Sequence, residues 1–231
     1  MNTAVITNQQ SWSSNPFDYW WNIDGDWVEP PNHRRNGLSG VKKVFIPGEG
    51  TFFIKIQRNH LHRSLRYPFG RPTVMREAET IKACHHLGVI APETIYCGKR
   101  KTSNGWQAVL VTRELENFIS LDQWLNSGSC ENDPLEIRKY LIQQIARTLS
   151  IFHRAHWQHG CLYPKHIFLH IAPNRSSAEV QIALIDLEKS RRRLIAKNAS
   201  GRDLNQLKRH LPQFSDEDWL LLTKHYQHYF K

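Results

Sequence analysis

The hydrophobic pattern of this 231-residue chain changes its period near the middle, and this change restricts the folds open to it. Residues 41–57 place apolar side chains on both sides of a PGEG turn at 47–50, with a period of two on the second strand, which predicts a β-hairpin. Residues 133–156 instead repeat apolar side chains at helical spacing, from Ile137 to Phe152, and predict a long amphipathic helix. A sheet-rich first half followed by a helix-rich second half indicates an α+β chain.

Shorter patterns complete the order of elements. The further predicted helices cover residues 73–88, 202–211 and 215–230. The further predicted strands cover residues 94–101, 106–115, 166–171 and 179–188, the last two joined by a Pro-Asn turn at 173–174. Asp133 and Ser215 are expected to cap the long helix and the last helix, because Asp and Ser accept hydrogen bonds from first-turn amides.

These elements divide the chain into three segments. Residues 1–35 are rich in Trp, Asn and Pro without clear periodicity, and we expect an irregular arm or short strands there. We expect three tryptophans of this segment, Trp20, Trp21 and Trp27, to pack on the domain rather than to bind a ligand. Residues 36–118 predict an N-terminal lobe of a sheet plus one helix, and residues 119–231 predict a mainly helical C-terminal lobe that carries the second hairpin.

The charge balance of the chain favours an anionic partner. Its 31 Lys and Arg residues exceed its 21 Asp and Glu residues, and the formal net charge is +10. A nucleotide, a phosphorylated sugar, a nucleic acid or an anionic membrane surface would suit this charge. No aromatic-interleaved RNA motif or zinc finger accompanies it, so nucleic acid is the least favoured partner. A solvated basic surface is the alternative that the charge alone leaves open.

Cysteine usage and the N-terminal sequence bear on the compartment. Cys84, Cys97, Cys130 and Cys161 form no CxxC pair, and we expect free thiols in a reducing compartment. The first residues lack a basic start followed by an apolar core, which argues against a secretory signal. No run approaches the roughly 18 apolar residues of a membrane span. We therefore expect a cytoplasmic protein and keep peripheral contact with the inner membrane open.

Ionisable residues lie where phosphoryl transfer would need them. That reaction needs a cation on the nucleotide phosphates and an acid to hold Mg²⁺. Lys55 lies in the middle of the second hairpin strand, and Glu77 on the following predicted helix could pair with it; a solvent-facing Lys is the alternative. Asp186 ends the strand IALID, where a metal-binding acid or a simple turn residue fits, and Glu188 is a weaker second candidate.

Three segments together resemble the protein-kinase-like superfamily. They are HGCLYPKHIFL at 159–169, LIDLE at 184–188 and GRDLNQL at 201–207. The sequence is most similar to the Kdo/WaaP lipopolysaccharide kinase family, especially its InaA-like branch, over about residues 37–210. The resemblance implies a two-lobed protein-kinase-like α+β fold that binds ATP in the cleft and uses Mg²⁺. It also implies an anionic phosphosugar or lipopolysaccharide-core acceptor of the heptose or Kdo type.

In the first lobe the resemblance assigns nucleotide-binding roles. Lys55 would hold the nucleotide phosphates, and Glu77 would be its helix partner. Gly37, Ser39 and Gly40 stand where a glycine-rich phosphate loop is expected, just before the first predicted strand. The GLSG sequence departs from a full GxGxxG pattern, so cradling of phosphate by this backbone is a weaker expectation.

In the second lobe the resemblance assigns the metal and the catalytic loop. Asp186 would be the metal-binding Asp, and His166 would fill the Asn position of the loop and support the metal or the loop. Asp203 would match the helical Asp that holds the loop backbone. Cys161 stands where the family has the loop Asp that orients the acceptor hydroxyl.

The replacement at Cys161 leaves two hypotheses. A neutral thiol is a poor base, and general-base catalysis is typically worth about 10²–10⁴-fold. Positioning and electrostatics can supply more than that, so an ATP-dependent kinase remains the first hypothesis. His159 could act as a substitute base or hold the loop, and Lys165 could neutralise the transferred phosphate or be solvated. The second hypothesis is a pseudokinase, a nucleotide-binding regulatory or scaffold protein in envelope or stress physiology.

Two further patterns have simpler alternative explanations. His153, His156 and His159 are spaced by three, but no Cys or acid completes a recognisable zinc set around them. The basic run from Lys189 to Arg193 would suit phosphates of a lipid sugar or a membrane surface, and a solvated cationic loop is its alternative.

Overall fold

The computed structural model describes residues 14–34, 37–127, 135–172 and 180–231. The chain divides into two compact units. The first unit comprises Met1–Ala78 and Glu93–Glu114, and the second comprises Glu79–Pro92 and Leu115–Lys231. The division falls inside helix α2 (Thr73–His86), so this one helix belongs to both units.

The first unit is built on a five-stranded antiparallel sheet with the strand order β1-β2-β3-β7-β6. The strands are β1 (Asp26–Arg34), β2 (Gly37–Ile46), β3 (Gly50–Arg58), β6 (Thr94–Thr102) and β7 (Gly105–Arg113). Strand β3 lies at the centre of the sheet, between β2 and β7. The predicted hairpin at residues 41–57 is confirmed as β2 and β3, and the two later strands are confirmed as β6 and β7.

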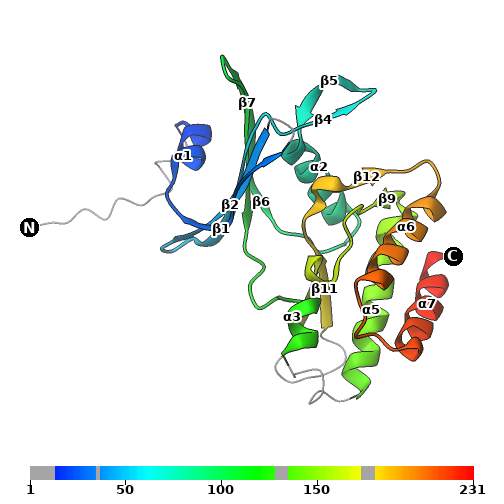
Figure 1. The fold of residues 1–231 in the computed structure, drawn as a ribbon. Coiled ribbons are helices and arrows are strands. Elements are labelled where there is room, and N and C mark those ends of the chain that lie inside the picture. Colours follow the sequence, from blue (N-terminus) through cyan, green and yellow to red (C-terminus); the bar gives the residue numbers. More distant parts are fainter. Residues whose placement is uncertain (1–13, 35–36, 128–134, 173–179) are drawn as a thin grey trace, which may run out of the picture. The chain divides into compact units, whose positions relative to one another are not determined.

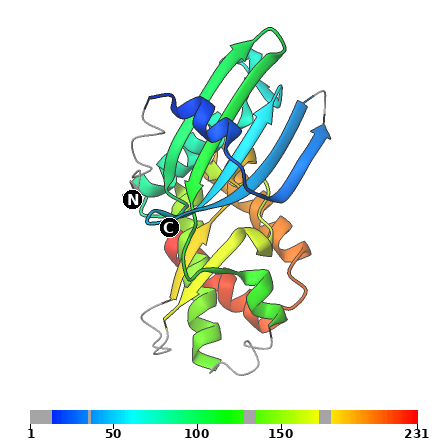
Figure 2. The same cartoon turned by 90° about the vertical axis from the view of Figure 1, so that its left-hand side faces the viewer.

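One face of this sheet is covered by the short helix α1 (Pro16–Asn22), which crosses the strands in Figure 2. The alternation in β3 sends Phe52 and Ile54 to this face, where both are fully buried. Phe17 and Trp20 of α1 pack into the same cluster, and the rings of Trp20 and Phe52 are 5.7 Å apart. Burial of large apolar side chains of this kind contributes about 1.5–3 kcal/mol each, which fixes the helix on the sheet.

The described part of residues 1–35 contains regular structure where we expected an irregular arm or short strands. Asn15 caps α1 through a hydrogen bond from the Asp18 amide to its side-chain oxygen, and Pro16 occupies the first turn. The nine-residue β1 follows and pairs only with β2. Its two prolines are accommodated because β1 is an edge strand with two register shifts. These local devices leave no hydrophobic period for a sequence pattern to detect.

A small separate hairpin of the first unit precedes α2. It consists of β4 (Leu61–Ser64) and β5 (Tyr67–Pro72), which pair with each other in a two-stranded sheet. The Arg71 guanidinium lies 4.8 Å from the Tyr67 ring and donates a hydrogen bond to its hydroxyl. The side chains of Leu65 and Phe69 are more than nine-tenths exposed, so this hairpin presents apolar groups to its surroundings.

The second unit is mainly helical. Its long helices are α5 (Leu135–Arg154), α6 (Ala196–Arg209) and α7 (Asp216–Phe230), and the short helix α3 (Leu121–Asn126) precedes them. The predicted stripe on α5 is confirmed, because Leu141, Ile145, Leu149 and Phe152 are fully buried. Helix α7 lies beside α5 in Figure 1, and Ser215 caps α7 as predicted, through a reciprocal capping box with Asp218.

The second unit also contains two small sheets. Strands β8 (Ile119–Ser120), β10 (Ile167–Ile171) and β11 (Val180–Leu184) form one, and β9 (Trp157–Gln158) and β12 (Arg191–Arg192) form the other. The predicted second hairpin is confirmed by the antiparallel pairing of β10 with β11. The expected turn at 173–174 and the expected cap Asp133 lie outside the described residues. The predicted α+β class is confirmed, and none of the described helices is long and apolar enough to cross a membrane.

Candidate active site

In the first unit, an ion pair links the central strand to the helix that follows it. Lys55 lies on β3, opposite Val41 of β2 and Leu110 of β7. Its ammonium nitrogen is 2.8 Å from Oε2 of Glu77 on α2, and the two side chains are only 14% and 9% exposed. The alternative of a solvent-facing Lys is therefore wrong, because the side chain is held on the helix side of the sheet.

A second contact from the same strand fixes the start of α2. Gln57, two residues after Lys55, is buried and accepts a hydrogen bond from the Val74 amide at 3.1 Å. Its side chain also exchanges hydrogen bonds with the Thr73 hydroxyl. One of the unpaired first-turn amides of α2 is thus satisfied by the strand that carries Lys55. Gln57 therefore positions the helix that carries Glu77, a role that we did not predict from the sequence.

The predicted phosphate-loop glycines lie within β2, not before it. Ser39 and Gly40 pair with Gln57 and Ile56 of β3, and β2 is also paired with β1 on its other side. A Cβ atom on Gly37 would come within 2.7 Å of the Asn59 carbonyl oxygen, so close packing of strands accounts for that glycine. Contact of Gly37, Ser39 and Gly40 with a nucleotide stays a prediction.

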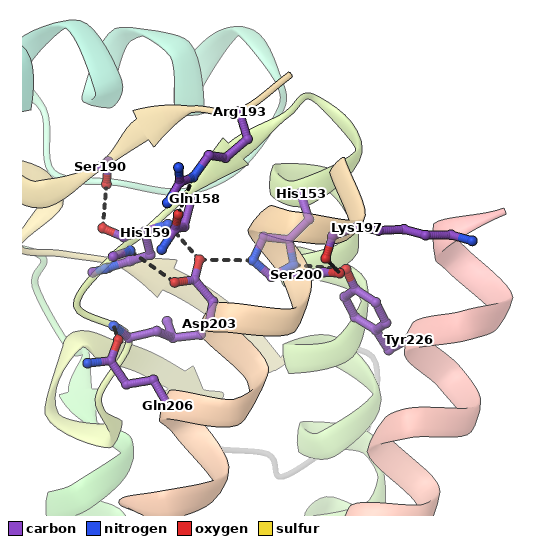
Figure 3. A network of polar contacts seen from close by, with 12 residues as sticks. His153, Gln158, His159, Ser190, Arg193, Lys197, Ser200, Asp203, Gln206 and Tyr226 are labelled. Carbon is purple, nitrogen blue, oxygen red and sulfur yellow. Dashed lines mark hydrogen bonds and ion pairs between the residues drawn. The ribbon is translucent and has the colours of Figure 1, made fainter. Parts of the chain in front are cut away.

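In the second unit, the segment from His159 to His166 is a loop held at its start by a buried carboxylate. Asp203 on α6 is fully buried, and its two oxygens accept hydrogen bonds from the backbone amides of His159 at 2.6 Å and Gly160 at 2.9 Å. The same carboxylate binds the His153 ring of α5 at 3.1 Å (Figure 3). Asp203 therefore joins two helices and the loop through charge-assisted hydrogen bonds.

Further polar contacts complete this network (Figure 3). Gln206, one turn after Asp203, accepts a hydrogen bond from the Leu162 amide at 3.0 Å. The Ser190 hydroxyl donates to the His159 carbonyl at 3.2 Å, and the Tyr226 hydroxyl of α7 bonds His153 at 2.9 Å. Burial raises the pKa of Tyr226. The start of the loop is thus held from α5, α6 and α7 together.

Gly160 is required by the path of the loop. It adopts φ = +76°, and a Cβ atom there would lie 2.9 Å from the backbone oxygen of Lys189. A residue with a side chain would be both strained and obstructed. The close approach brings the loop against the segment that follows Asp186, which is the 3-10 helix η4 (Leu187–Lys189).

His159 is placed for support rather than for proton transfer. Its ring is fully buried, and Nε2 lies 3.0 Å from the Ile185 carbonyl, to which it donates because a carbonyl only accepts. Burial lowers the pKa of His159 to about 4, so the ring is neutral near pH 7. Its Nδ1 is buried and has no hydrogen-bond partner among the described residues. The geometry favours the loop-holding alternative over the substitute base.

Cys161 lies at the position of the expected loop Asp and is almost fully buried, at 6% exposed. Burial and the nearby Asp186 charge raise the pKa of its thiol, while Lys189 and Lys165 act in the opposite direction. The Lys189 ammonium nitrogen lies 3.7 Å from its sulfur. The residue is therefore a neutral thiol near pH 7 and a weak candidate for a general base.

His166 and Asp186 lie side by side next to Cys161. His166 is the last residue of the 3-10 helix η2 (Pro164–His166), and its ring Nδ1 donates to the Cys161 carbonyl at 2.7 Å. Its Nε2 is 3.5 Å from Oδ2 of Asp186. Asp186 leaves β11 in the left-handed conformation, with φ = +54°, which turns its carboxylate back toward the loop. One potential ligand atom from each of Cys161, His166 and Asp186 lies within 4.8 Å of the other two.

The remaining sequence candidates lie around this group. Lys165 is exposed, and its charge acts on Cys161. Glu188 is half-buried on η4. His153 and His156 each bind protein groups through Nδ1, namely the Tyr226 hydroxyl and the Arg193 carbonyl. The predicted residues of this unit are therefore brought together by β10, β11 and α6, with Lys165 at the exposed edge.

Gln57 and Gln206 were not identified from the sequence. His153 and Lys189 were considered only in a histidine set and a basic run, and their contacts with Asp203 and Cys161 were not expected. Gln206 follows Asp203 by three positions within GRDLNQL, and this helical spacing on the loop-facing side could have identified it. Lys189 belongs to a basic run whose members look alike in the sequence, and no local signal separates it from the others.

Comparisons with known proteins identify related sequences. Residues 18–226 match the Lipopolysaccharide kinase (Kdo/WaaP) family. The chain is 37% identical to Protein InaA of Escherichia coli over 210 residues, which cover 91% of this chain and 94% of that protein. It is 25% identical to the lipopolysaccharide core heptose(I) kinase WaaP of Pseudomonas aeruginosa over 119 residues, 51% of this chain and 44% of that protein.

A solved structure shares the fold. It is that of WaaP in complex with acyl carrier protein, with a TM-score of 0.75 and 21% identity, covering 96% of this chain and 87% of that one. At this level of identity the likeness concerns the fold, and it confirms the predicted kinase-like architecture with two lobes.

Proposed function

Because this chain belongs to the lipopolysaccharide kinase (Kdo/WaaP) family, we propose that it transfers the terminal phosphate of ATP to a hydroxyl of a lipopolysaccharide-core sugar. The observation that carries the proposal is the buried ion pair between Lys55 and Glu77. Phosphoryl transfer relies on positioning and charge, and a Lys held by a helical Glu is the arrangement that kinases use for nucleotide phosphates. The acceptor of this proposal is a heptose- or Kdo-type sugar.

The cost of burying the Lys55–Glu77 pair supports a functional reading. Taking both charges out of water gains little net stability, since desolvation offsets most of their attraction. Gln57 adds a further polar contact on the same side of β3 and holds the first turn of α2. In this proposal Lys55 contacts the nucleotide phosphates, Glu77 orients it and Gln57 is a positioning residue.

The second unit would supply the metal-binding and acceptor-facing groups. In this proposal Asp186 holds Mg²⁺, and Asp203 and Gln206 fix the loop that carries Cys161 toward the acceptor. Mg²⁺ neutralises phosphate charge when it is bound. One carboxylate with phosphate and water oxygens is an ordinary Mg²⁺ shell, so Asp186 fits this ion. The nitrogen of His166 and the sulfur of Cys161 are poorer donors for Mg²⁺, which prefers oxygen.

The structure also supports a second candidate, a nucleotide-binding pseudokinase that acts in regulation or scaffolding. The observation that favours it is the burial and raised pKa of the Cys161 thiol, which leaves the acceptor hydroxyl without a carboxylate partner. Neither His159 nor Lys165 replaces it: the first is buried and bound to a carbonyl, and the second is a cation. Both candidates require nucleotide binding by Lys55.

A transfer assay separates the two candidates. The purified protein is incubated with labelled ATP, Mg²⁺ and lipopolysaccharide core lacking its phosphates, and binding of ATP is measured in parallel. We expect transfer that disappears in Asp186→Ala, and weaker ATP binding in Lys55→Ala. The exposed Lys82→Ala on α2 serves as the matched control and is expected to retain both signals. Binding without transfer across a panel of acceptors would support the pseudokinase, and absence of binding would exclude both.

A substrate of this class would be presented at a membrane, and the β4–β5 hairpin offers a surface for it. Leu65 in its turn and Phe69 on β5 are almost completely exposed, near the exposed basic residues Arg63 and Arg66. Apolar side chains flanked by Arg suit the interface of an anionic bilayer, where each basic residue contributes about 1 kcal/mol. We therefore place peripheral contact with the inner membrane at this hairpin within the proposal.

Sedimentation with vesicles tests this surface. We expect the protein to bind vesicles that contain anionic phospholipid and to bind neutral vesicles weakly. The double variant Leu65→Ser/Phe69→Ser should lose most of this binding, while Leu220→Ser, which changes an exposed apolar residue on α7, should not. Equal binding of both variants to anionic vesicles would remove the hairpin from the proposal and leave the transfer reaction untouched.

A further inference from the structure

The group formed by Cys161, His166 and Asp186 offers one sulfur, one nitrogen and one oxygen donor within 4.8 Å of one another. The two positions that differ from the usual kinase loop supply the softer donors, and Asp186 supplies the oxygen. Thiolate, imidazole and carboxylate together are the ligands of Zn²⁺ and related d-block ions, whereas Mg²⁺ takes oxygen ligands. This set of donors therefore suits a Zn²⁺-type ion better than Mg²⁺.

The imidazole of His166 is oriented for metal binding. Its Nδ1 lies 2.7 Å from the Cys161 carbonyl oxygen and must donate to it, so the proton of the neutral ring is on Nδ1. The lone pair of the neutral ring is then on Nε2, which faces the Asp186 carboxylate at 3.5 Å. Metal-binding histidines almost always donate their other ring N–H to such a partner, because this fixes tautomer and orientation.

The distance between the nitrogen and oxygen donors matches that expected for two ligands of one metal ion. Nitrogen and oxygen ligands lie about 2.0–2.2 Å from a tetrahedral Zn²⁺, which places them roughly 3.4 Å apart. The observed 3.5 Å between His166 Nε2 and Asp186 Oδ2 is close to that value and longer than an ordinary hydrogen bond. Three protein ligands with an open fourth position are the pattern of a reactive zinc site rather than of a structural one.

Burial supports the same conclusion. Cys161 and His166 are buried, and Asp186 is partly exposed, so an ion could enter from the side of the carboxylate. When the sulfur–metal bond forms, the thiol proton leaves to solvent and the sulfur becomes a thiolate. The Lys189 ammonium, 3.7 Å from the sulfur, favours that negative charge and is not itself a ligand.

We propose that Cys161 Sγ, His166 Nε2 and Asp186 Oδ2 form a site for a divalent d-block ion of the Zn²⁺ type, with the fourth position open to a phosphate or water oxygen. The three ligands all come from the second unit and need no nucleotide. Asp186 is also the Mg²⁺ ligand of the proposed function, so the two ions would compete for this carboxylate. The site would give the loop a Lewis acid at the position where a kinase ordinarily has a general base.

Titration with Co²⁺, a spectroscopic substitute for Zn²⁺, tests the site in the full-length apo-protein. We expect one equivalent of Co²⁺ to produce a sulfur-to-metal charge-transfer absorption, which Zn²⁺ then displaces. Cys161→Ser should abolish the absorption and weaken Zn²⁺ binding at least as much as the roughly 10–100-fold typical of losing an outer-shell partner. Cys97→Ser, in the first unit, is the matched control and should behave as the unchanged protein.

A second variant keeps the test decisive if Cys161→Ser folds poorly, as judged by circular dichroism. His166→Asn leaves the thiol unaltered. It should weaken the sulfur-to-metal absorption of the Co²⁺ complex and lower the Zn²⁺ affinity by a similar factor. The proposal is overturned if the folded protein binds no Zn²⁺ in competition with a chelating dye, or if Cys161→Ser binds it equally well. A transfer assay with Mg²⁺ reports independently on the proposed function.

Discussion

The two ends of the loop from His159 to His166 are built in opposite ways. At its start, Asp203 of α6 accepts hydrogen bonds from the backbone amides of His159 and Gly160, and its carboxylate is fully buried. At its end, Cys161 and His166 present side-chain donors to the partly exposed Asp186. The first end is a closed network of matched partners, and the second is an open group of potential ligands.

This difference separates the support of the loop from its chemistry. The start of the loop depends on backbone amides, which every residue type supplies, so its geometry survives changes of the side chains that follow. The end of the loop depends on the identity of single side chains. A Cys in place of the expected Asp therefore changes what the loop can do without changing where it lies.

The largest effect is expected at the supporting end. Asp203→Ala leaves two buried amides and the His153 ring without their acceptor, and loss of one partner from a buried charged network costs about 3–5 kcal/mol. Urea unfolding should show this loss of the free energy of unfolding. Asp122→Asn, at an exposed position on α3, should change it by less than about 0.5 kcal/mol. If Asp203→Ala were as stable as the unchanged protein, the network would not be what holds the loop.

At the end of the loop that carries Cys161, substitutions should change the rate of phosphoryl transfer. Cys161→Asp restores the carboxylate that orients an acceptor hydroxyl, and we expect phosphoryl transfer to rise by about 10²-fold or more. Cys161→Ser changes the same atom without adding a carboxylate and is expected to give no such gain. The measurement is the initial rate with labelled ATP and lipopolysaccharide core. An unchanged rate in Cys161→Asp would mean that the native residue does not limit the chemistry.

Acid should act on the supporting end through His159. The unfolded chain binds a proton at an ordinary pKa of 6.5, whereas the folded ring has a pKa of about 4. Because the unfolded state binds more protons in this window, the free energy of unfolding should fall as the pH falls from 6.5 to 4, by up to about 3 kcal/mol. Urea unfolding across this range should give a smaller fall in His159→Gln, which cannot take up that proton.

The smallest effect is expected for the second acceptor on α6. Gln206→Leu removes the partner of the Leu162 amide, and an unsatisfied buried amide costs about 1–2 kcal/mol. The neighbouring exposed Asn205→Leu is the control and should leave the melting temperature nearly unchanged. If Gln206→Leu lowered stability as much as Asp203→Ala, the two residues would act as one unit rather than as a major and a minor contact.

Periodic patterns allowed most of the fold to be predicted. The alternation around β3 and the stripe on α5 each arise from one buried face, so a single sequence carries them. Helix α1 was not predicted, because a capping Asn carries no hydrophobic period, and for β1 an irregular arm and short strands both remained open. The glycines of β2 were expected in a loop before the strand. A sequence does not show which neighbouring segment comes close to a glycine, so their place within the sheet could not be foreseen.

Within the site, the Lys55–Glu77 pair was expected from the sequence, whereas the contacts of Gln57 and Lys189 were not. Lys55 and Asp186 stand out because charges beside apolar residues need a reason, whereas Asp203 is expected only from the family resemblance. Gln57 and Lys189 act through contacts with residues far away in the chain, at Val74 and Cys161. Such pairings depend on tertiary packing, and only the folded structure shows them.

Anchoring of the loop by Asp203 also sets how its backbone exchanges with solvent. The amides of His159 and Gly160 belong to no helix or sheet ladder, and loop amides of this kind usually exchange hydrogen for deuterium quickly. Here their acceptor lies 44 and 43 residues further along the chain, on a buried position of α6. These two amides can exchange only when α6 separates from the loop, so they report on the opening of this whole part of the molecule.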